Sequence, residues 1–148
     1  YAFRKREGAN LQEDILKSIK NINSNISKIE NTWDEEKKNY ADKYKSKINK
    51  IIDTYKLDEQ RLLQEIAIIL DKRDINEEIV RFKSHIDFFI SYIKDYDLLG
   101  KRLNFLIQEL FREINTITSK SEILEINKLV LDTKNELEKI KEQIQNIL

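Results

Sequence analysis

The sequence contains no cysteine, no proline and no methionine, and only two of its 148 residues are glycine. Without cysteine the chain can form neither a disulfide nor a thiolate–metal site. This fits a reducing compartment, so we expect a cytoplasmic protein. No run of about 18 apolar residues occurs, and a membrane-spanning helix is therefore not expected. Because proline and glycine interrupt helices, their scarcity favours long helices over a compact mixed fold.

The sequence also lacks an excess of either charge: 27 basic and 27 acidic residues give a net charge of +0. A domain that binds nucleic acid by itself normally has a basic excess, because neutralisation of phosphates drives its affinity. Any nucleic-acid-binding surface is therefore expected to be local, or to be completed by other domains or subunits. Charged residues still make up 36% of the chain, which suits helices with narrow apolar stripes.

Apolar residues recur at steps of three and four along five segments, which predicts an all-α fold of about five helices. The first helix is expected from a cap at Asn10 to about Tyr55, a length of about 66 Å. Because this is too long for one small globule, we predict a long helical arm or connector over 1–57. Residues 58–148 are then predicted to form a C-terminal helical domain, arranged as an antiparallel bundle.

The other four helices are expected to begin at polar capping residues or after a glycine. Asp58 is predicted to cap a helix that runs to about Asp71, and Asp74 a helix that ends near Tyr96, with Glu77 at its capping-box position. After a connection over 95–100, the fourth helix is predicted at about 101–118. Ser121 is then expected to cap the last one.

Each predicted helix has one apolar seam, and these seams are expected to form the core. In the first helix the heptad-like seam comprises Ile15, Ile19, Ile22, Ile26, Ile29 and Trp33, and continues through Tyr40, Tyr44, Ile48 and Ile52. The later seams comprise Leu62, Ile66 and Ile69; Ile79, Phe82, Ile86, Phe89 and Ile93; Leu103, Ile107, Leu110, Ile114 and Ile117; and Ile126, Val130, Thr133, Leu137, Ile140, Ile144 and Ile147.

The predicted fourth helix has two carboxylates four residues apart, Glu109 and Glu113, with Arg112 beside them. On a helix these three side chains share a face that is separate from the apolar seam. Paired carboxylates can bind a divalent metal ion, and the arginine can bind an anion next to it. The ordinary alternative is a set of solvated surface salt bridges, each worth a few tenths of a kcal/mol.

A second polar stripe lies on the predicted third helix, where Glu78, Arg81 and His85 follow one another at steps of three and four. His85 is the only histidine in the chain. An imidazole changes charge near neutral pH and can also bind metal, so this side chain suits either proton transfer or ligation. The alternative is a partly buried structural histidine, because His85 lies beside the apolar seam.

Taken together, these segments resemble the YicC-like family of bacterial endoribonucleases, whose motifs occur here in the same order. The matching segments are RKREG at 4–8, RLLQEIA from 61, DINEEIVRFKSHIDFF from 74, GKRLNFLIQELFREINTITSK from 100 and LEKIKEQIQNI near the end. The resemblance implies an endoribonuclease, a ring-like and hexameric homo-oligomer, and a chain that is the C-terminal half of a longer protein. The start at Tyr1 and the lack of methionine agree with a fragment whose N-terminal domain is absent.

Since a single histidine does not support a two-histidine mechanism, we predict metal-assisted cleavage of RNA phosphodiester bonds. Glu109, Glu113 and Glu78 are the predicted ligands of Mn²⁺ or Mg²⁺, and His85 is expected to transfer a proton or to ligate. Together these four are the predicted catalytic residues. The residues predicted to bind RNA are Arg81, Lys101, Arg102, Arg112 and Lys120.

Two alternatives stay open at this point. In one, the chain is a non-catalytic helical module that assembles subunits and frames the RNA, while the chemistry requires the N-terminal domain. In the other it is a generic coiled-coil scaffold, for which the polar residues at 109, 112 and 113 have no function.

Overall fold

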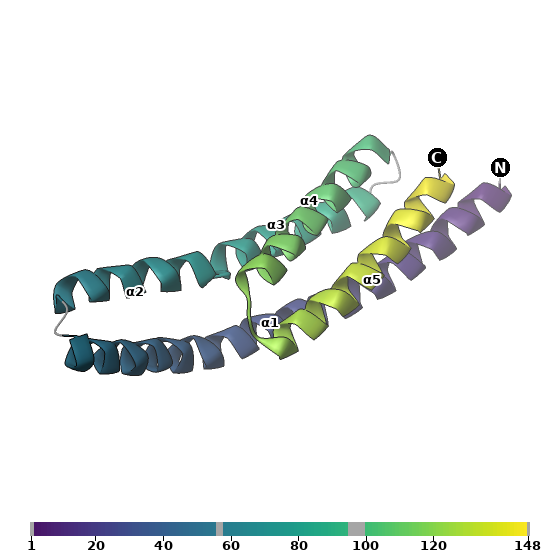
Figure 1. Cartoon of the computed structure of the whole chain (residues 1–148). Helices are drawn as coiled ribbons and strands as arrows, with labels where there is room; N and C mark the ends of the chain where they lie inside the picture. Colours follow the sequence, from purple (N-terminus) through teal and green to yellow (C-terminus); the bar gives the residue numbers. More distant parts are fainter. Residues whose placement is uncertain (1, 56–57, 95–99, 148) are drawn as a thin grey trace.

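The computed structural model describes residues 2–55, 58–94 and 100–147, and within these ranges all regular structure is helical (Figure 1). The helices are α1 (Ala2–Tyr55), α2 (Glu59–Arg73), α3 (Asn76–Lys94), α4 (Gly100–Lys120) and α5 (Leu124–Ile147). The all-α prediction is thereby confirmed. Gly100, expected in the connection over 95–100, instead begins α4. The rest of that connection, including the predicted helix end near Tyr96, lies outside the described residues.

The first helix is longer than the sequence predicted, and the expected cap at Asn10 is wrong. α1 begins at Ala2 and extends for 54 residues, which corresponds to about 80 Å. The segment before Asn10 consists largely of alanine, arginine, lysine and glutamate, which are good helix formers. Gly8 opposes them by only about 1 kcal/mol, so the helix continues through it.

Asp58 caps α2 as predicted, because its side chain accepts a hydrogen bond from the Gln60 N–H at 3.1 Å. Asp74 and Ser121 also accept from the backbone N–H two residues further on, at 2.9 and 3.1 Å, but α3 and α5 begin only at Asn76 and Leu124, so these two side chains lie just before the capping positions. The capping box predicted for Glu77 does not form, because this side chain turns along the helix and pairs with Arg81 at 3.4 Å.

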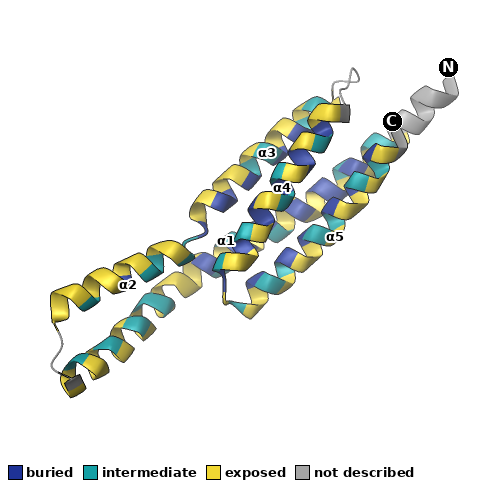
Figure 2. Ribbon diagram, turned by 45° about the horizontal axis from the view of Figure 1, so that its top comes forward, coloured by how far each residue is buried: buried dark blue, intermediate teal, exposed yellow. Residues whose placement is uncertain are grey.

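Four helical segments form a bundle: the first half of α1, then α3, α4 and α5 (Figure 2). Both ends of the chain lie at one end of the molecule, because α5 runs back along α1 (Figure 1). The predicted seams are buried here, and the largest fully buried side chains include Phe82, Phe89, Ile22, Leu110 and Ile114. The bundle thus holds α3 and α4 side by side through one continuous core.

Beyond the bundle, the second half of α1 (residues 34–55) pairs with α2, and we call this two-helix extension the arm (Figures 1 and 2). Its predicted seam is only partly covered. Ile66 is buried, whereas Tyr40, Tyr44 and Ile48 are half-buried.

The arm contacts the bundle through a polar junction just before α5. Arg73 lies 2.6 Å from Glu122, and the Tyr40 hydroxyl donates to the same carboxylate at 2.8 Å. The guanidinium also lies over the Tyr40 ring, 5.6 Å from its centroid. Burial, followed by hydrogen bonding that includes Glu122, raises the pKa of Tyr40.

Residues of the predicted 1–57 and 58–148 ranges share the bundle core, and a division at residue 57 stays a prediction. Among the described helices, none combines the length and apolar character that crossing a membrane would require.

Candidate metal and RNA site

The two polar stripes predicted from the sequence face each other across the α3–α4 pair. The Arg81 Nε on α3 donates a hydrogen bond to the Glu113 Oε1 on α4 at 3.0 Å. Each stripe borders the apolar seam that packs the two helices together, so core packing brings the polar edges into contact.

His85, Glu109 and Glu113 form a group in which one donor atom from each residue lies within 4.8 Å of the others. Two ligands on opposite sides of a divalent ion lie about 4.2 Å apart, so small side-chain adjustments would close this group around an ion. Glu113 is buried, at 6% exposure, whereas His85 and Glu109 are half-buried. The group therefore combines a protected carboxylate with a face open to solvent.

Glu78 lies outside this group and is connected to it through Arg81. Only 2% of Glu78 is exposed. Its Oε1 lies 2.6 Å from the Lys120 Nζ and 3.5 Å from the Arg81 Nη2, and Oε2 has no hydrogen-bond partner among the described residues. The Lys120 ammonium also donates to the Asp74 carbonyl at 3.2 Å. A continuous chain of contacts therefore runs from Lys120 through Glu78 and Arg81 to Glu113.

Electrostatics keep Arg81 charged at the centre of this chain. Its hydrogen bond to Glu113 raises the pKa of the guanidinium, and the charges of Glu113 and Glu78 act in the same direction. The arginine also pairs with Glu77, at 3.4 Å. Arg81 consequently offsets the charge of carboxylates that would otherwise repel one another.

The other predicted RNA-binding residues lie on the solvent side of α4. The Arg112 side chain is 76% exposed, and its Nη1 lies 3.9 Å from the Glu109 Oε1. Because this contact is long, the guanidinium is free to turn toward an anion. Lys101 and Arg102 are exposed near the start of the helix, about 10–12 Å along the axis from Glu109. The structure therefore places Arg112 at the His85 group and the other two about two turns away.

Two exposed aromatic residues beside the group were not predicted from the sequence: Phe88 on α3 and Phe105 on α4. One turn beyond them, the Arg102 guanidinium lies 5.6 Å from the centroid of the Tyr92 ring. Extending the Arg81–His85 stripe by further steps of three and four would have reached Phe88 and Tyr92. Nothing in the sequence, however, indicates which α4 residues lie opposite them.

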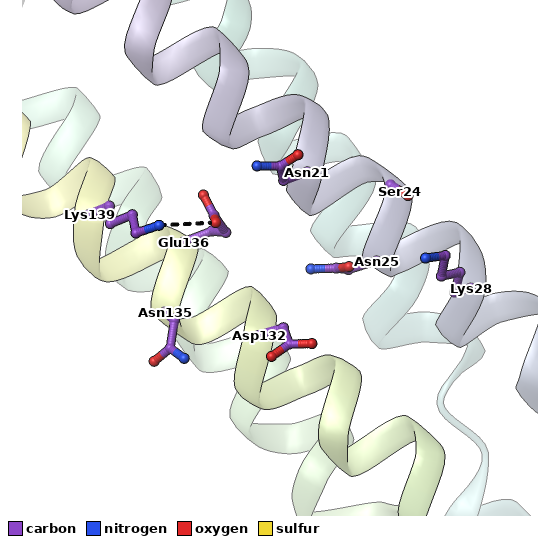
Figure 3. Close-up of a pocket in the computed structure, with 8 residues that line it drawn as sticks. All are labelled: Asn21, Ser24, Asn25, Lys28, Asp132, Asn135, Glu136 and Lys139. Carbon is purple, nitrogen blue, oxygen red and sulfur yellow. Dashed lines mark hydrogen bonds and ion pairs between the residues drawn. The ribbon is translucent and has the colours of Figure 1, made fainter.

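A separate groove of about 430 Å³ lies between α1 and α5 (Figure 3). Its lining is polar and comes from both helices: Asn21, Ser24, Asn25, Lys28, Asp132, Asn135, Glu136 and Lys139. Glu136 is already paired with Lys139, at 3.4 Å. Within the described part of the chain, only the His85 group brings three potential metal ligands together.

The molecule is thus an all-α bundle with a candidate metal-binding group on one pair of antiparallel helices. Residues 29–148 match the family model described as "Endoribonuclease YicC-like, C-terminal". The chain belongs to this family, and the resemblance predicted from its motifs is confirmed.

Two curated relatives have the same name, "Probable endoribonuclease YicC". The chain is 46% identical to the one from Clostridioides difficile (strain 630) over 146 residues, which cover 98% of the chain and 50% of that protein. It is 30% identical to the one from Haemophilus influenzae (strain ATCC 51907 / DSM 11121 / KW20 / Rd) over 154 residues, covering 99% of the chain and 50% of the relative. The chain therefore spans about half the length of the curated relatives it matches.

Proposed function

We propose that this chain provides the catalytic group of an endoribonuclease that cleaves RNA phosphodiester bonds with the help of a divalent metal ion. The observation that supports this most strongly is the convergence of His85, Glu109 and Glu113 from two helices. The names of the relatives support the reaction class, since both are called probable endoribonucleases.

The donor set favours Mn²⁺ over Mg²⁺. Mg²⁺ prefers oxygen ligands and keeps several waters, whereas Mn²⁺ accepts an imidazole beside carboxylates. We assign His85, Glu109 and Glu113 as the residues that would hold the ion. An ion bound there supplies a more acidic water and neutralises negative charge on the phosphate that is cleaved.

The remaining polar residues then orient the ligands or bind the substrate. Arg81 fixes the buried Glu113 carboxylate, while Glu78 and Lys120 support that arginine from the other side. In this proposal Glu78 is a positioning residue that acts through Arg81, in place of the ligand role expected from the sequence. Arg112 binds a phosphate at the group, because its guanidinium is exposed there.

Arg81 and Lys120 are also candidates for RNA contact, since both are partly exposed: 48% and 29% of their side chains, respectively. Lys101 and Arg102 would contact phosphates further along the strand. Each of these four contacts stays a prediction. Substituting a residue that contacts phosphate should weaken RNA binding and reduce its salt dependence, with little dependence on base sequence.

The decisive variants are Glu109→Gln and Glu113→Gln, which preserve side-chain size and remove the charge. Cleavage of an end-labelled single-stranded RNA would be measured in Mn²⁺ or EDTA, with Glu138→Gln on an exposed position of α5 as the matched control. Loss of outer-shell partners alone typically costs about 10–100-fold, so loss of a ligand should slow cleavage by about 100-fold or more. Full activity in both variants would contradict the proposal, as would equal losses in the control.

Assembly is the second candidate function, and it is favoured by apolar residues exposed outside the His85 group. Leu124 and Leu131 on α5 are 69% and 59% exposed, and Leu63 and Ile68 on α2 are 46% and 49% exposed. We propose that such surfaces form subunit contacts in the homo-oligomer, a hexamer by family resemblance. Light scattering coupled to size-exclusion chromatography gives the subunit number directly, and a monomer at working concentrations would contradict this.

A further inference from the structure

Phe88 and Phe105 are the two phenylalanines of the bundle whose rings face solvent, at 55% and 60% exposure, within its described part. Both lie on the polar side of their helices, away from the buried seams of α3 and α4. Exposing two large aromatic side chains to water has a cost unless a partner covers them. Their position relative to the His85 group indicates what that partner is.

Two contacts determine how α3 and α4 align. We call the side of the α3–α4 pair that carries both polar stripes the polar face. Arg81 contacts Glu113 at one end of it, and Tyr92 contacts Arg102 at the other. Since the helices are antiparallel, eleven residues forward on α3 correspond to eleven residues backward on α4.

Both phenylalanines lie between these two contacts. Phe88 follows His85 by three residues, and Phe105 precedes Glu109 by four, so each ring lies about one helical turn beyond the candidate ligand on its own helix. The polar face therefore has a fixed order: the arginine–carboxylate contact, the candidate metal group, the two exposed rings and the arginine–tyrosine stack.

We propose that Phe88 and Phe105 form a stacking platform for unpaired RNA bases next to the site of cleavage. This inference rests on the proposed function and adds the side chains that would hold the bases of its RNA substrate. Aromatic side chains that alternate with cations are the usual means of holding a single strand, because every base offers a face for stacking. Here Arg112 lies on one side of the rings, with Lys101 and Arg102 on the other, and all three are exposed to bind phosphates.

The charge of this face favours RNA over a second copy of the chain. The core of a protein–protein interface is depleted of charged residues, whereas these rings lie between exposed arginines and a group of carboxylates. A duplex also fits poorly, because its bases are stacked on one another and their faces are not available. The platform thus selects unpaired segments.

The test separates binding from cleavage by measuring affinity in EDTA. A short fluorescent RNA without self-complementarity is titrated with the chain, and fluorescence anisotropy reports the dissociation constant. Stacking is worth about 1–3 kcal/mol per base, so Phe88→Ala and Phe105→Ala should each weaken binding about fivefold or more. Ile51→Ala is the matched control, because this residue is also an exposed apolar side chain (41%) but lies in the arm, away from α3 and α4.

Conservative variants show whether the aromatic face is what matters. Phe88→Trp and Phe105→Trp should bind as well as the parent chain, whereas the corresponding leucine variants should resemble the alanine variants. The same RNA annealed to its complement should bind the parent more weakly than the single strand does. Unchanged affinity in both alanine variants would overturn the inference, and so would full binding by the leucine variants or equal affinity for the duplex.

Two further measurements distinguish the stacking platform from the proposed cleavage function and from a subunit interface. Cleavage of the same RNA by the parent chain in Mn²⁺ is scored separately from its binding in EDTA, so a parent chain that binds the single strand without cleaving it would overturn the proposed function alone. Size-exclusion chromatography of the alanine variants tests whether a second copy of the chain, rather than RNA, covers the two rings. If they dissociate an assembly that the leucine variants preserve, the rings belong to a subunit interface and the platform is wrong.

Discussion

The bundle and the arm share one helix, and α1 is buried very differently in the two. In its first half, Ile15, Ile22 and Ile29 are at most 2% exposed, because α3, α4 and α5 complete the core around them. In its second half, Tyr40 and Ile48 continue the same spacing but are only half-buried against α2. The seam thus determines which face turns inward, while the number of partner helices determines how completely that face is covered.

The same contrast holds for the charged residues. Glu113 and Glu78 in the bundle are 6% and 2% exposed and are held by Arg81. Glu122 at the arm junction is paired with Arg73 but has 59% of its side chain exposed. A rigid pair of helices with buried carboxylates can hold ligands in place, which explains why the candidate site lies on the bundle rather than on the arm.

The largest expected effect is a difference in core stability between the two regions. Ile114→Ala in the bundle creates a cavity at a fully buried position and should cost about 3–5 kcal/mol of unfolding free energy. Ile48→Ala in the arm removes a half-buried side chain and should cost about 1 kcal/mol or less. Urea unfolding followed by circular dichroism measures both, and equal losses would contradict the division into bundle and arm.

A smaller effect is expected for the buried carboxylate that supports Arg81. Glu78→Gln removes the charge that Lys120 and Arg81 share and should lower the unfolding free energy by about 1–3 kcal/mol, limited because both cations are partly exposed. Glu122→Gln should lower the unfolding free energy by less, since the Arg73–Glu122 pair is open to solvent. The same urea experiment compares them, and a larger loss for Glu122→Gln would reverse the proposed ranking.

The smallest effect is a dependence of stability on pH at the arm junction. The hydrogen bonds from Tyr40 and Arg73 lower the pKa of Glu122 below its ordinary value of 4.5. A lowered pKa in the folded state stabilises the fold above pH 4.5, and this contribution is lost as the pH falls through the folded-state pKa. In Glu122→Gln the decline of the urea midpoint below pH 4.5 should therefore be shallower than in the parent. Parallel curves would mean that the junction does not influence acid stability.

The sequence was sufficient to predict the helices and their inward faces, because the spacing of apolar residues is local information. The seams of α3, α4 and α5 and the bundle half of the α1 seam are buried where described, and Leu110 and Ile114 are fully buried in the core. The expected cap at Asn10 failed because capping preference is weak compared with the helix-forming tendency of the residues before it.

The candidate site was predictable only one helix at a time. Spacing placed Arg81 with His85 on one helix and Glu109 with Glu113 on another, but the alignment of α3 with α4 depends on how the whole core packs. For that reason the pairing of Arg81 with Glu113, and the position of Phe105, could not be obtained from periodicity.

The measurement that tests the central claim most directly is cleavage of an end-labelled single-stranded RNA by the chain and by its His85→Ala variant, each in Mn²⁺ and in EDTA. We expect cleavage by the parent that requires Mn²⁺ and is lost in the variant, which would place the catalytic group between α3 and α4. Absence of cleavage by a folded parent chain, or equal cleavage by the variant, would contradict that claim and favour the assembly function instead.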